Sequence, residues 1–402
     1  MKVCFVAPEF LPIIGGVGTH IVELIHHLPD DIDIHVLTLR RKIPNSDLYF
    51  TDDEIKKRFN RNINLHVITE AKDEFIYNAK FQLECYKWIQ KLYKDEQIDL
   101  FHSHFGHMPD LLVKLGGLDI PIVTTAHVTN AGLAGGIKES GIRFKDLETA
   151  GKYSIVLAPF LKYIERIYLS KSKNIIAVSN WMRDILINNY GIDEKKIKTI
   201  PNGVDIEKYK PNIQNKILIN NHGPMVLFTG RLTSTKGLNY LIKAIPQVLK
   251  TIKDAHFVFV GGGNPKPYLE YLERLDIPKN NYTFIGYVKD EKDVAALYSN
   301  ANIYVAPTLF ENLPIRILEA MSSGIPVIAS NICAIPEVIT DGVDGFLIPP
   351  KDVETLAQKI LYVLQNDMKQ IRKNARETVI NKFNWNKIGE ETSLFYQQII
   401  SK

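Results

Sequence analysis

The chain has 402 residues, 45% of them hydrophobic and 23% charged, with 49 basic and 45 acidic residues that leave a net charge of +4. This length predicts two or three domains of ordinary globular composition, and so small a charge excludes nucleic acid as an expected partner. Three scattered cysteines exclude a disulfide framework, and since no apolar run suits a signal peptide or approaches the ~20 residues of a spanning helix, we expect a cytoplasmic protein.

Short apolar runs alternate with helical patterns through the first half of the chain. Val3 to Ala7 is typical of a buried strand, and Val17 to Leu28 follows with apolar residues at helical spacing. A second long helix is predicted from Glu74 to Tyr93. Further strands are predicted at Ile32 to Leu39, Ile63 to Ile68, Leu100 to Ser103, Ile122 to Thr125 and Ile175 to Val178. Strands that are apolar throughout indicate a parallel sheet covered by helices on both faces.

A second series of apolar strands begins at Met225, after a polar stretch rich in Asn, Lys and Pro. Its predicted strands are Val226 to Phe228, Phe257 to Val260, Thr283 to Ile285, Ile303 to Ala306, Val327 to Ala329 and Phe346 to Ile348. We therefore predict an α/β protein with two doubly wound, Rossmann-like domains at residues 1–206 and 225–382, a linker at 207–224 and a terminal amphipathic helix at 383–402. Because open α/β sheets bind ligands beyond the carboxyl ends of their strands, the two domains should face a central cleft.

A glycine-rich segment, Gly15-Gly16-Val17-Gly18, joins the first predicted strand to the first helix. Glycines at such a place let the backbone approach a phosphate or a sugar closely. A dinucleotide fingerprint is the rival interpretation. It fits poorly, because the third glycine is missing and seven residues, Pro8 to Ile14, separate the strand from the glycines.

Histidines follow two strands of the first domain. In His102-Ser103-His104-Phe105-Gly106-His107 three imidazoles could bind zinc, but no carboxylate stands at ligand spacing, so a structural role or contact with a substrate is favoured over a metal. His127 ends the strand Ile122 to Thr125 and should face the cleft; a plain core or surface histidine is the alternative. Asp31-Ile32-Asp33 opens a strand, which favours a solvated strand start over a metal site. No metal or other cofactor is expected.

The second domain places cations and glycines after its first two strands. Arg231 and Lys236 stand in Arg231-Leu232-Thr233-Ser234-Thr235-Lys236-Gly237, at the start of a predicted helix, where positive charge opposes the helix dipole. Such cations suit a ligand that carries or develops negative charge on phosphate oxygens. The next strand closes with Gly261-Gly262-Gly263, which a plain tight turn explains almost as well as a ligand site.

Two acids flank a predicted helix start near the end of the second domain. Glu311 lies on a strand-to-helix loop, Glu319 about one turn inside the helix, and Pro314 suits the first turn between them. Carboxylates accept hydrogen bonds from sugar hydroxyls, and the helix N-terminus attracts phosphate. Solvated surface charges are the alternative for the pair taken alone.

This arrangement, with Ala320-Met321 and the strand Gly324 to Ile328 after it, resembles the donor-sugar motif of retaining GT-B glycosyltransferases of the group 1 or family 4 type. The resemblance extends in order over nearly the whole chain. It includes the glycine loop, His127, Ser179, the loop Pro201 to Asp205 and the Arg231/Lys236 motif. It implies the GT-B fold, with the final helix crossing back to the first domain, and transfer of a hexose-type sugar from a nucleoside-diphosphate sugar without a metal.

The resemblance also implies roles for single residues. His127 and Glu311 would contact the donor sugar at the reacting centre, Glu319 would bind the ribose, and Arg231 and Lys236 would hold the diphosphate. Gly16, Gly262, Val288 and the backbone N–H groups of Asn312 and Leu313 would complete the donor site. The family often has Gly-Phe-Gly where this chain has Asn312-Leu313-Pro314, and Pro314 has no N–H to donate. This difference bears on the identity of the donor sugar.

Two alternatives remain at this stage: a GT-B epimerase or phosphorylase, and a non-catalytic sugar-binding protein on the same fold. The acceptor is expected on the first domain as a glycan or lipid-linked glycan of polysaccharide or cell-surface synthesis. Two basic stretches there, Lys56 to Arg61 and Leu161 to Lys173, are candidate faces for peripheral contact with the inner face of a membrane, although each suits a solvated helix face.

Overall fold

The computed structural model describes residues 1–401 apart from 12–14, 41–48, 71–75, 141, 143, 145, 146, 148, 215–222 and 289. The chain forms two compact units. Unit 1 comprises Met1–Asn130, Pro159–Asn202 and Trp385–Lys402, and unit 2 comprises Ala131–Ala158 and Gly203–Asn384. Part of the predicted linker, residues 215–222, lies outside the described residues.

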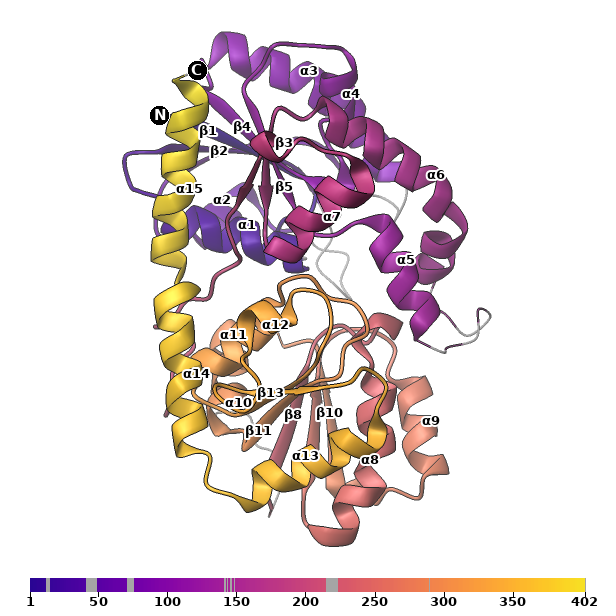
Figure 1. Ribbon diagram of the computed structural model, residues 1–402. Coiled ribbons are helices and arrows are strands. Elements are labelled where there is room, and N and C mark those ends of the chain that lie inside the picture. The colour runs from indigo at the N-terminus through magenta and orange to yellow at the C-terminus, as the bar shows by residue number, and fades with distance from the viewer. Residues whose placement is uncertain are drawn as a thin grey trace. The chain divides into compact units, whose positions relative to one another are not determined.

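Unit 1 is built on a seven-stranded parallel sheet in the order β3-β2-β1-β4-β5-β6-β7 (Figure 1). The strands are β1 (Lys2–Ala7), β2 (Asp33–Arg40), β3 (Ile63–Glu70), β4 (Leu100–His104), β5 (Ile122–Ala126), β6 (Asn174–Ala177) and β7 (Ile197–Thr199). The helices between them are α1 (Gly16–His27), α2 (Asp52–Lys56), α3 (Ile76–Asp95), α4 (Leu111–Leu115), α5 (Asn130–Glu139), α6 (Thr149–Lys171) and α7 (Asn180–Tyr190), of which α5 and the start of α6 belong to unit 2.

Unit 2 repeats this plan with a six-stranded parallel sheet in the order β10-β9-β8-β11-β12-β13. Its strands are β8 (Met225–Thr229), β9 (His256–Val260), β10 (Tyr282–Gly286), β11 (Ile303–Ala306), β12 (Val327–Ser330) and β13 (Phe346–Ile348). Its further helices are α8 (Leu238–Thr251), α9 (Lys266–Arg274), α10 (Glu291–Asn300), α11 (Ile315–Ser322), α12 (Ile335–Val338), α13 (Val353–Gln365) and α14 (Lys369–Lys382). The two sheets confirm the predicted α/β class, and each strand order reverses direction at its first strand, as in doubly wound folds.

The apolar runs of the sequence become strands because the sheets are buried on both faces. β8, β9 and β11 are buried at every residue, as is β4. The edge strand β7 was not predicted, since it is three residues long and includes the exposed Lys198. An edge strand is covered on fewer sides, so its sequence shows a weaker apolar pattern.

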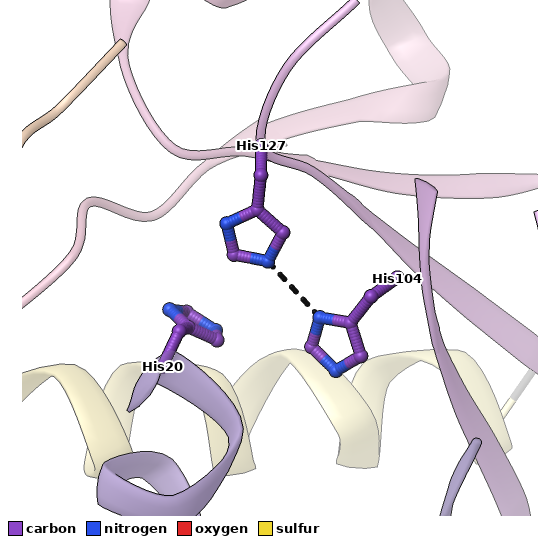
Figure 2. Close-up of side chains that lie close together, drawn as sticks. All are labelled: His20, His104 and His127. Carbon is purple, nitrogen blue, oxygen red and sulfur yellow. Dashed lines mark hydrogen bonds between the residues drawn. The ribbon is translucent and has the colours of Figure 1, made fainter. Parts of the chain in front are cut away.

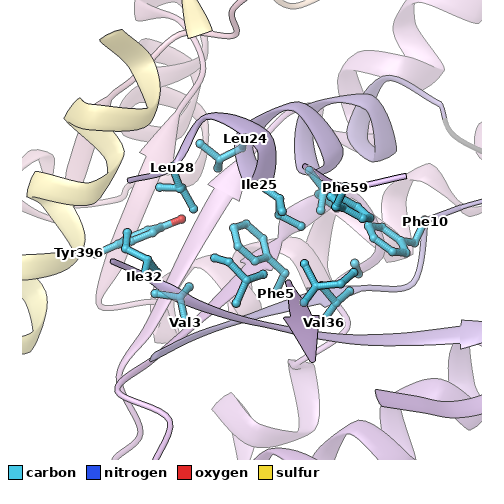
Figure 3. Close-up of a cluster of buried hydrophobic side chains, with 14 of the residues drawn as sticks. Val3, Phe5, Phe10, Leu24, Ile25, Leu28, Ile32, Val36, Phe59 and Tyr396 are labelled. Atoms are coloured by element: carbon cyan, nitrogen blue, oxygen red, sulfur yellow. The ribbon is translucent and has the colours of Figure 1, made fainter. Parts of the chain in front are cut away.

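The last helix, α15 (Trp385–Ile400), belongs to the core of unit 1. Trp385 and Tyr396 are fully buried in a cluster that includes Val3 and Phe5 of β1 (Figure 3). The close approach of α15 to the end of α1 requires a glycine, because a Cβ on Gly389 would lie 2.1 Å from the carbonyl oxygen of His27. Among the described residues, no helix is both long and apolar enough to cross a membrane.

Candidate functional site

The sheet order of unit 2 gathers the predicted donor-site residues at one edge. β10, β9, β8 and β11 are neighbours in the sheet, and all of them are parallel. Their carboxyl ends therefore lie side by side. Arg231, Gly262, Val288 and Glu311 each follow one of these four strands within a few residues. Residues that are far apart in sequence thus come together through strand order alone.

The loops after β8 and β9 are joined backbone to backbone. The N–H of Leu232 donates to the carbonyl of Gly262 at 2.9 Å, and the N–H of Gly261 donates to Gly286 at the end of β10 at 2.8 Å. Gly261 has φ +149°, and a Cβ there would lie 1.8 Å from the carbonyl oxygen of Gly230. The predicted glycine turn therefore has a structural role, because it allows close contact with the loop that presents Arg231. The side chain of Arg231 is exposed.

The loop that presents Lys236 is fixed to the loop after β11. The carbonyl of Thr235 accepts hydrogen bonds from the Thr308 hydroxyl at 2.9 Å and from the Leu309 N–H at 2.8 Å. Gly237 has φ +66°, and a Cβ there would lie 1.9 Å from the carbonyl oxygen of Pro307. In this motif Lys236 supplies the charged side chain, and Gly237 allows the close backbone contact with Pro307.

Lys236 and Glu311 form an ion pair in which the Lys236 ammonium donates to Glu311 Oε2. Their side chains are 27% and 25% exposed, so the pair is half-buried and less screened than a surface ion pair. The predicted diphosphate cation and the predicted sugar-binding carboxylate are therefore direct neighbours. A carboxylate held by a cation in this way remains an acceptor of hydrogen bonds from hydroxyl groups.

Glu319 is buried on α11 and holds a second ion pair. Arg316 Nη1 lies 2.9 Å from Glu319 Oε1 and 2.8 Å from Oε2. Burial raises the pKa of the Glu319 carboxyl, and Arg316 opposes this rise. Glu319 was predicted inside this helix, but Arg316 was not predicted as its partner. Their spacing of three residues on a helix is a signal for such a pair.

The remaining predicted donor residues lie around these ion pairs. Asn312 and Leu313 are buried in the turn that precedes α11, with Pro314 at its N-cap. Val288 is partly buried two residues beyond β10. These positions are at the carboxyl edge of the sheet, as the donor-site prediction requires, but no ligand contact is assigned to them.

One contact near Glu311 was not predicted. Gly136 of α5 lies against Phe310, the residue before Glu311, and a Cβ on Gly136 would lie only 2.3 Å from the Cβ of Phe310. The C-terminal end of α5 is held within unit 2 by two further contacts. The Tyr240 hydroxyl donates a hydrogen bond of 3.2 Å to the Ser140 carbonyl, and Lys351 forms an ion pair with Glu139. The loop that presents Glu311 is therefore backed by α5.

In unit 1 His127 is part of a buried histidine cluster, with His104 and His20 (Figure 2). His127 directly follows β5 and His104 ends the neighbouring β4, so parallel pairing places them side by side. His104 Nδ1 and His127 Nε2 share a hydrogen bond of 3.0 Å. His20 projects from α1 edge-on to His127, with ring centroids 4.6 Å apart, and its Nδ1 is 2.9 Å from Asn202 Oδ1.

Burial keeps the imidazoles of His20 and His127 neutral at physiological pH. It lowers the pKa of His20 to about 4 and lowers the pKa of His127 well below its ordinary value. A neutral imidazole donates through one nitrogen and accepts through the other. His127 can therefore orient a polar ligand by hydrogen bonding without adding a charge.

The cluster also has the composition of a metal-ligand set. One ring nitrogen from each of His20, His104 and His127 lies within 4.8 Å of the others. This is a different trio from the one considered in the sequence, because His102 uses both ring nitrogens in hydrogen bonds of 2.6 Å to Tyr396 and Thr125, and the side chain of His107 lies outside the described residues. The direct His104–His127 hydrogen bond favours a hydrogen-bonded network over metal ligation.

Gly16 lies in the first turn of α1, and a Cβ there would meet nothing within 4 Å. The steric constraint falls instead on Gly15, whose N–H donates to Glu9 Oε1 at 2.5 Å and whose Cβ would collide with that oxygen. Residues 12–14 of this loop lie outside the described residues.

The chain matches two protein families in succession. Residues 14–208 match Glycosyltransferase Family 4, and residues 209–378 match Glycosyl transferases group 1. An uncharacterized glycosyltransferase of Methanocaldococcus jannaschii is 26% identical over 99% of this chain and 98% of its own length. The UDP-Gal:alpha-D-GlcNAc-diphosphoundecaprenol alpha-1,3-galactosyltransferase of Escherichia coli is 26% identical over 98% and 97%.

Solved structures show the same fold. Sucrose-phosphate synthase from Thermosynechococcus elongatus superposes with a TM-score of 0.78 at 18% identity, over 100% of this chain and 99% of its own. HepE from Anabaena, in complex with UDP and glucose, superposes with a TM-score of 0.74 at 18% identity, over 99% of both chains. These likenesses confirm the GT-B fold class.

Proposed function

Because the chain belongs to the glycosyl transferases group 1 family, we propose that this glycosyltransferase moves a hexose-type sugar from a nucleoside-diphosphate sugar to an acceptor hydroxyl with retention of configuration. The observation that carries this proposal is the ion pair of Lys236 with Glu311 at the carboxyl edge of the unit 2 sheet. It sets a cation suited to a diphosphate beside a carboxylate suited to sugar hydroxyls.

The donor is assigned to unit 2. Lys236 and Arg231 would neutralise the charge that grows on the diphosphate as the sugar–oxygen bond breaks, an effect that is strongest for preorganised charges in a partly dry site. Glu311 would accept hydrogen bonds from donor-sugar hydroxyls. Glu319 would accept those of the ribose, and Arg316, which covers it in the described structure, would have to give up part of its contact.

His127 is assigned to the sugar at the reacting centre. Its neutral imidazole is oriented by His104 through the 3.0 Å hydrogen bond. A neutral group adds no positive charge beside the sugar, where positive charge develops as the leaving group departs. His127 would therefore bind a hydroxyl without opposing the reaction.

Retention follows if the acceptor attacks from the face that the diphosphate leaves. The acceptor oxygen would form the new bond to the anomeric carbon, the bond to the diphosphate oxygen would break, and the departing phosphate would receive the acceptor proton. No enzyme nucleophile is needed, which agrees with Glu311 being held by Lys236. We place the acceptor among glycans or lipid-linked glycans; the acceptor named for the Escherichia coli relative is of the second kind.

Hydrolysis of the donor in the absence of an acceptor tests the proposal directly. Each of several α-configured nucleotide sugars is mixed with the enzyme, and the first sugar released is read by proton NMR before it mutarotates. We expect one donor to yield the α-anomer. Initial release of the β-anomer would overturn retention, and conversion of a donor to its epimer without release would favour the epimerase alternative.

A further inference from the structure

The start of the predicted linker is bound to the rest of unit 2 through one arginine. Residues 206–211, which we call the tethered segment, belong to this unit. Arg376 of α14 donates through Nη2 to the carbonyl of Ile206 at 3.3 Å and through Nη1 to that of Tyr209 at 3.2 Å. The same Nη1 donates to the carbonyl of Ser322, the last residue of α11. One half-buried guanidinium therefore joins the tethered segment to the C-terminal end of α11.

The position of Arg376 suits the end of a helix. The last carbonyls of a helix have no partner within it, and the helix dipole favours a cation there. A guanidinium presents several N–H donors in one rigid plane, so it can hold three carbonyls at once, whereas a lysine ammonium is a point charge on a flexible stem.

Two further contacts press the tethered segment against α11. The Ser322 hydroxyl donates a hydrogen bond of 2.5 Å to the carbonyl of Tyr209. Gly324, directly after the helix, has φ +68°, and a Cβ there would lie 3.1 Å from Cγ of Pro211. The segment and the helix end therefore have little room to move independently.

The tethered segment reaches Glu319 through two tyrosines. The buried ring of Tyr209 lies edge-on to that of Tyr298 on α10, with centroids 5.9 Å apart. Burial raises the pKa of the Glu319 carboxyl, and Arg316 and a hydrogen bond from the Tyr298 hydroxyl oppose this rise. Tyr298 therefore contacts both the tethered segment and the buried carboxylate.

A second connection follows the helix itself. Ser322 comes three residues after Glu319 on α11, which is about 4.5 Å along the helix axis. Closely packed interiors transmit a displacement instead of absorbing it. A shift at the end of α11 would therefore move the carboxylate that the proposed function assigns to the ribose.

We propose that Arg376 is a positioning residue for Glu319. It holds the tethered segment and the end of α11 together, and this keeps the carboxylate where the ribose hydroxyls can reach it. The inference rests on the proposed assignment of Glu319 to the ribose of the donor. It adds a residue that has no ligand contact assigned to it and that follows Glu319 by 57 positions in the chain.

Discrimination between a ribonucleotide and its 2′,3′-dideoxy counterpart tests this inference. Each is titrated into the full chain by calorimetry, with whichever of UDP, GDP and ADP the wild type binds. Hydrogen bonds from ribose hydroxyls to a carboxylate should make the ribonucleotide bind at least about tenfold more tightly. Arg376→Met should lose most of this preference. Its affinity for the dideoxynucleotide should stay within about threefold of the wild type, because the diphosphate contacts are independent of Arg376.

A side chain that only stabilises the fold would leave the preference unchanged in the folded variant, and thermal unfolding identifies the folded variants. Arg376→Lys is the milder variant and should show a preference about threefold below that of the wild type, since it keeps the charge but not the planar fork. Lys373→Met is the matched control, because Lys373 is on the same helix and its side chain is 67% exposed. It should discriminate as the wild type does.

The outcomes separate this inference from the proposed function. If Glu319→Ala loses the preference while the folded Arg376 variants retain it, the inference is overturned and the donor site stands. Equal loss in Lys373→Met would also overturn it. A preference that survives in Glu319→Ala, or is absent from the wild type, would overturn the ribose assignment and the inference with it. A wild type that binds no nucleotide would overturn the proposed function as a whole.

Discussion

The two candidate ligand regions use opposite electrostatic strategies. The donor edge of unit 2 holds fixed charges in two ion pairs, Lys236–Glu311 and Arg316–Glu319. The cluster of unit 1 holds three buried imidazoles, at least two of which, His20 and His127, burial keeps neutral. The difference matches the proposed chemistry: a diphosphate that gains negative charge needs cations, whereas a sugar that gains positive charge is better served by neutral hydrogen-bonding groups.

The largest difference between the charged edge and the neutral cluster is expected from Lys236→Ala. This substitution removes the cation proposed to stabilise the departing diphosphate, and it leaves Glu311 without its ion-pair partner. We therefore expect kcat to fall about a thousandfold. Steady-state kinetics of donor hydrolysis would measure it. Lys243→Ala, an exposed lysine on the following helix α8, should be unchanged. A loss of less than about tenfold in Lys236→Ala would contradict an electrostatic role at the diphosphate.

A smaller effect is expected from Gly136→Ala, which changes no charge. The new Cβ would overlap Phe310 at 2.3 Å and displace the loop that carries Glu311, so kcat/KM should fall about ten- to a hundredfold. Gly135→Ala is the matched control, since a Cβ there meets nothing within 4 Å and alanine favours the helix. Equal activity of the two variants would show that α5 does not position Glu311.

The histidine cluster should make the free energy of unfolding depend on pH. The folded pKa of His20 is lowered to about 4 from 6.5, so the unfolded state binds more protons between these values. The cluster's contribution is therefore fully present above pH 6.5 and is lost as pH falls toward 4, by at most about 3 kcal/mol for His20. Urea unfolding across this range should show a shallower pH dependence for His20→Gln than for the wild type. Identical slopes would mean that His20 does not hold this lowered pKa.

The smallest effect is expected from metal removal. If cations of the chain serve the diphosphate and the histidine cluster is a hydrogen-bonded network, dialysis against EDTA should leave donor hydrolysis unchanged. An activity lost with EDTA, restored by zinc and absent from His104→Ala would instead make the trio of His20, His104 and His127 a metal site.

The sequence predicts those features of the fold and site that leave a pattern within a short stretch of the chain. The apolar runs predict the buried strands because burial on both faces leaves a local apolar pattern. The short edge strand β7 is not fully buried at any position, so it shows no such pattern and was not predicted. Arg231, Lys236, Glu311 and Glu319 could be proposed because charged residues at strand ends and helix starts leave local signals. The donor-site roles of these residues remain proposals.

Contacts set by tertiary packing left no such signal. Gly136 and Phe310 are 174 residues apart, and nothing in either segment indicates that a backbone and a ring must meet. The bond between His20 and Asn202 joins positions 182 residues apart. The sequence likewise does not show whether His102 is available to a metal. In the structure its Nδ1 is hydrogen-bonded to the hydroxyl of Tyr396 on α15, a contact that depends on tertiary packing.

The donor site of unit 2 is tested by calorimetric titration of the full chain with UDP, GDP and ADP, alongside Lys236→Ala and Glu319→Ala. We expect low-micromolar binding of one nucleotide that weakens at least about tenfold in both variants, because each removes a charge assigned to a different part of the same ligand. No binding of any of the three by well-folded protein would contradict the donor site and leave a non-catalytic sugar-binding role for the fold.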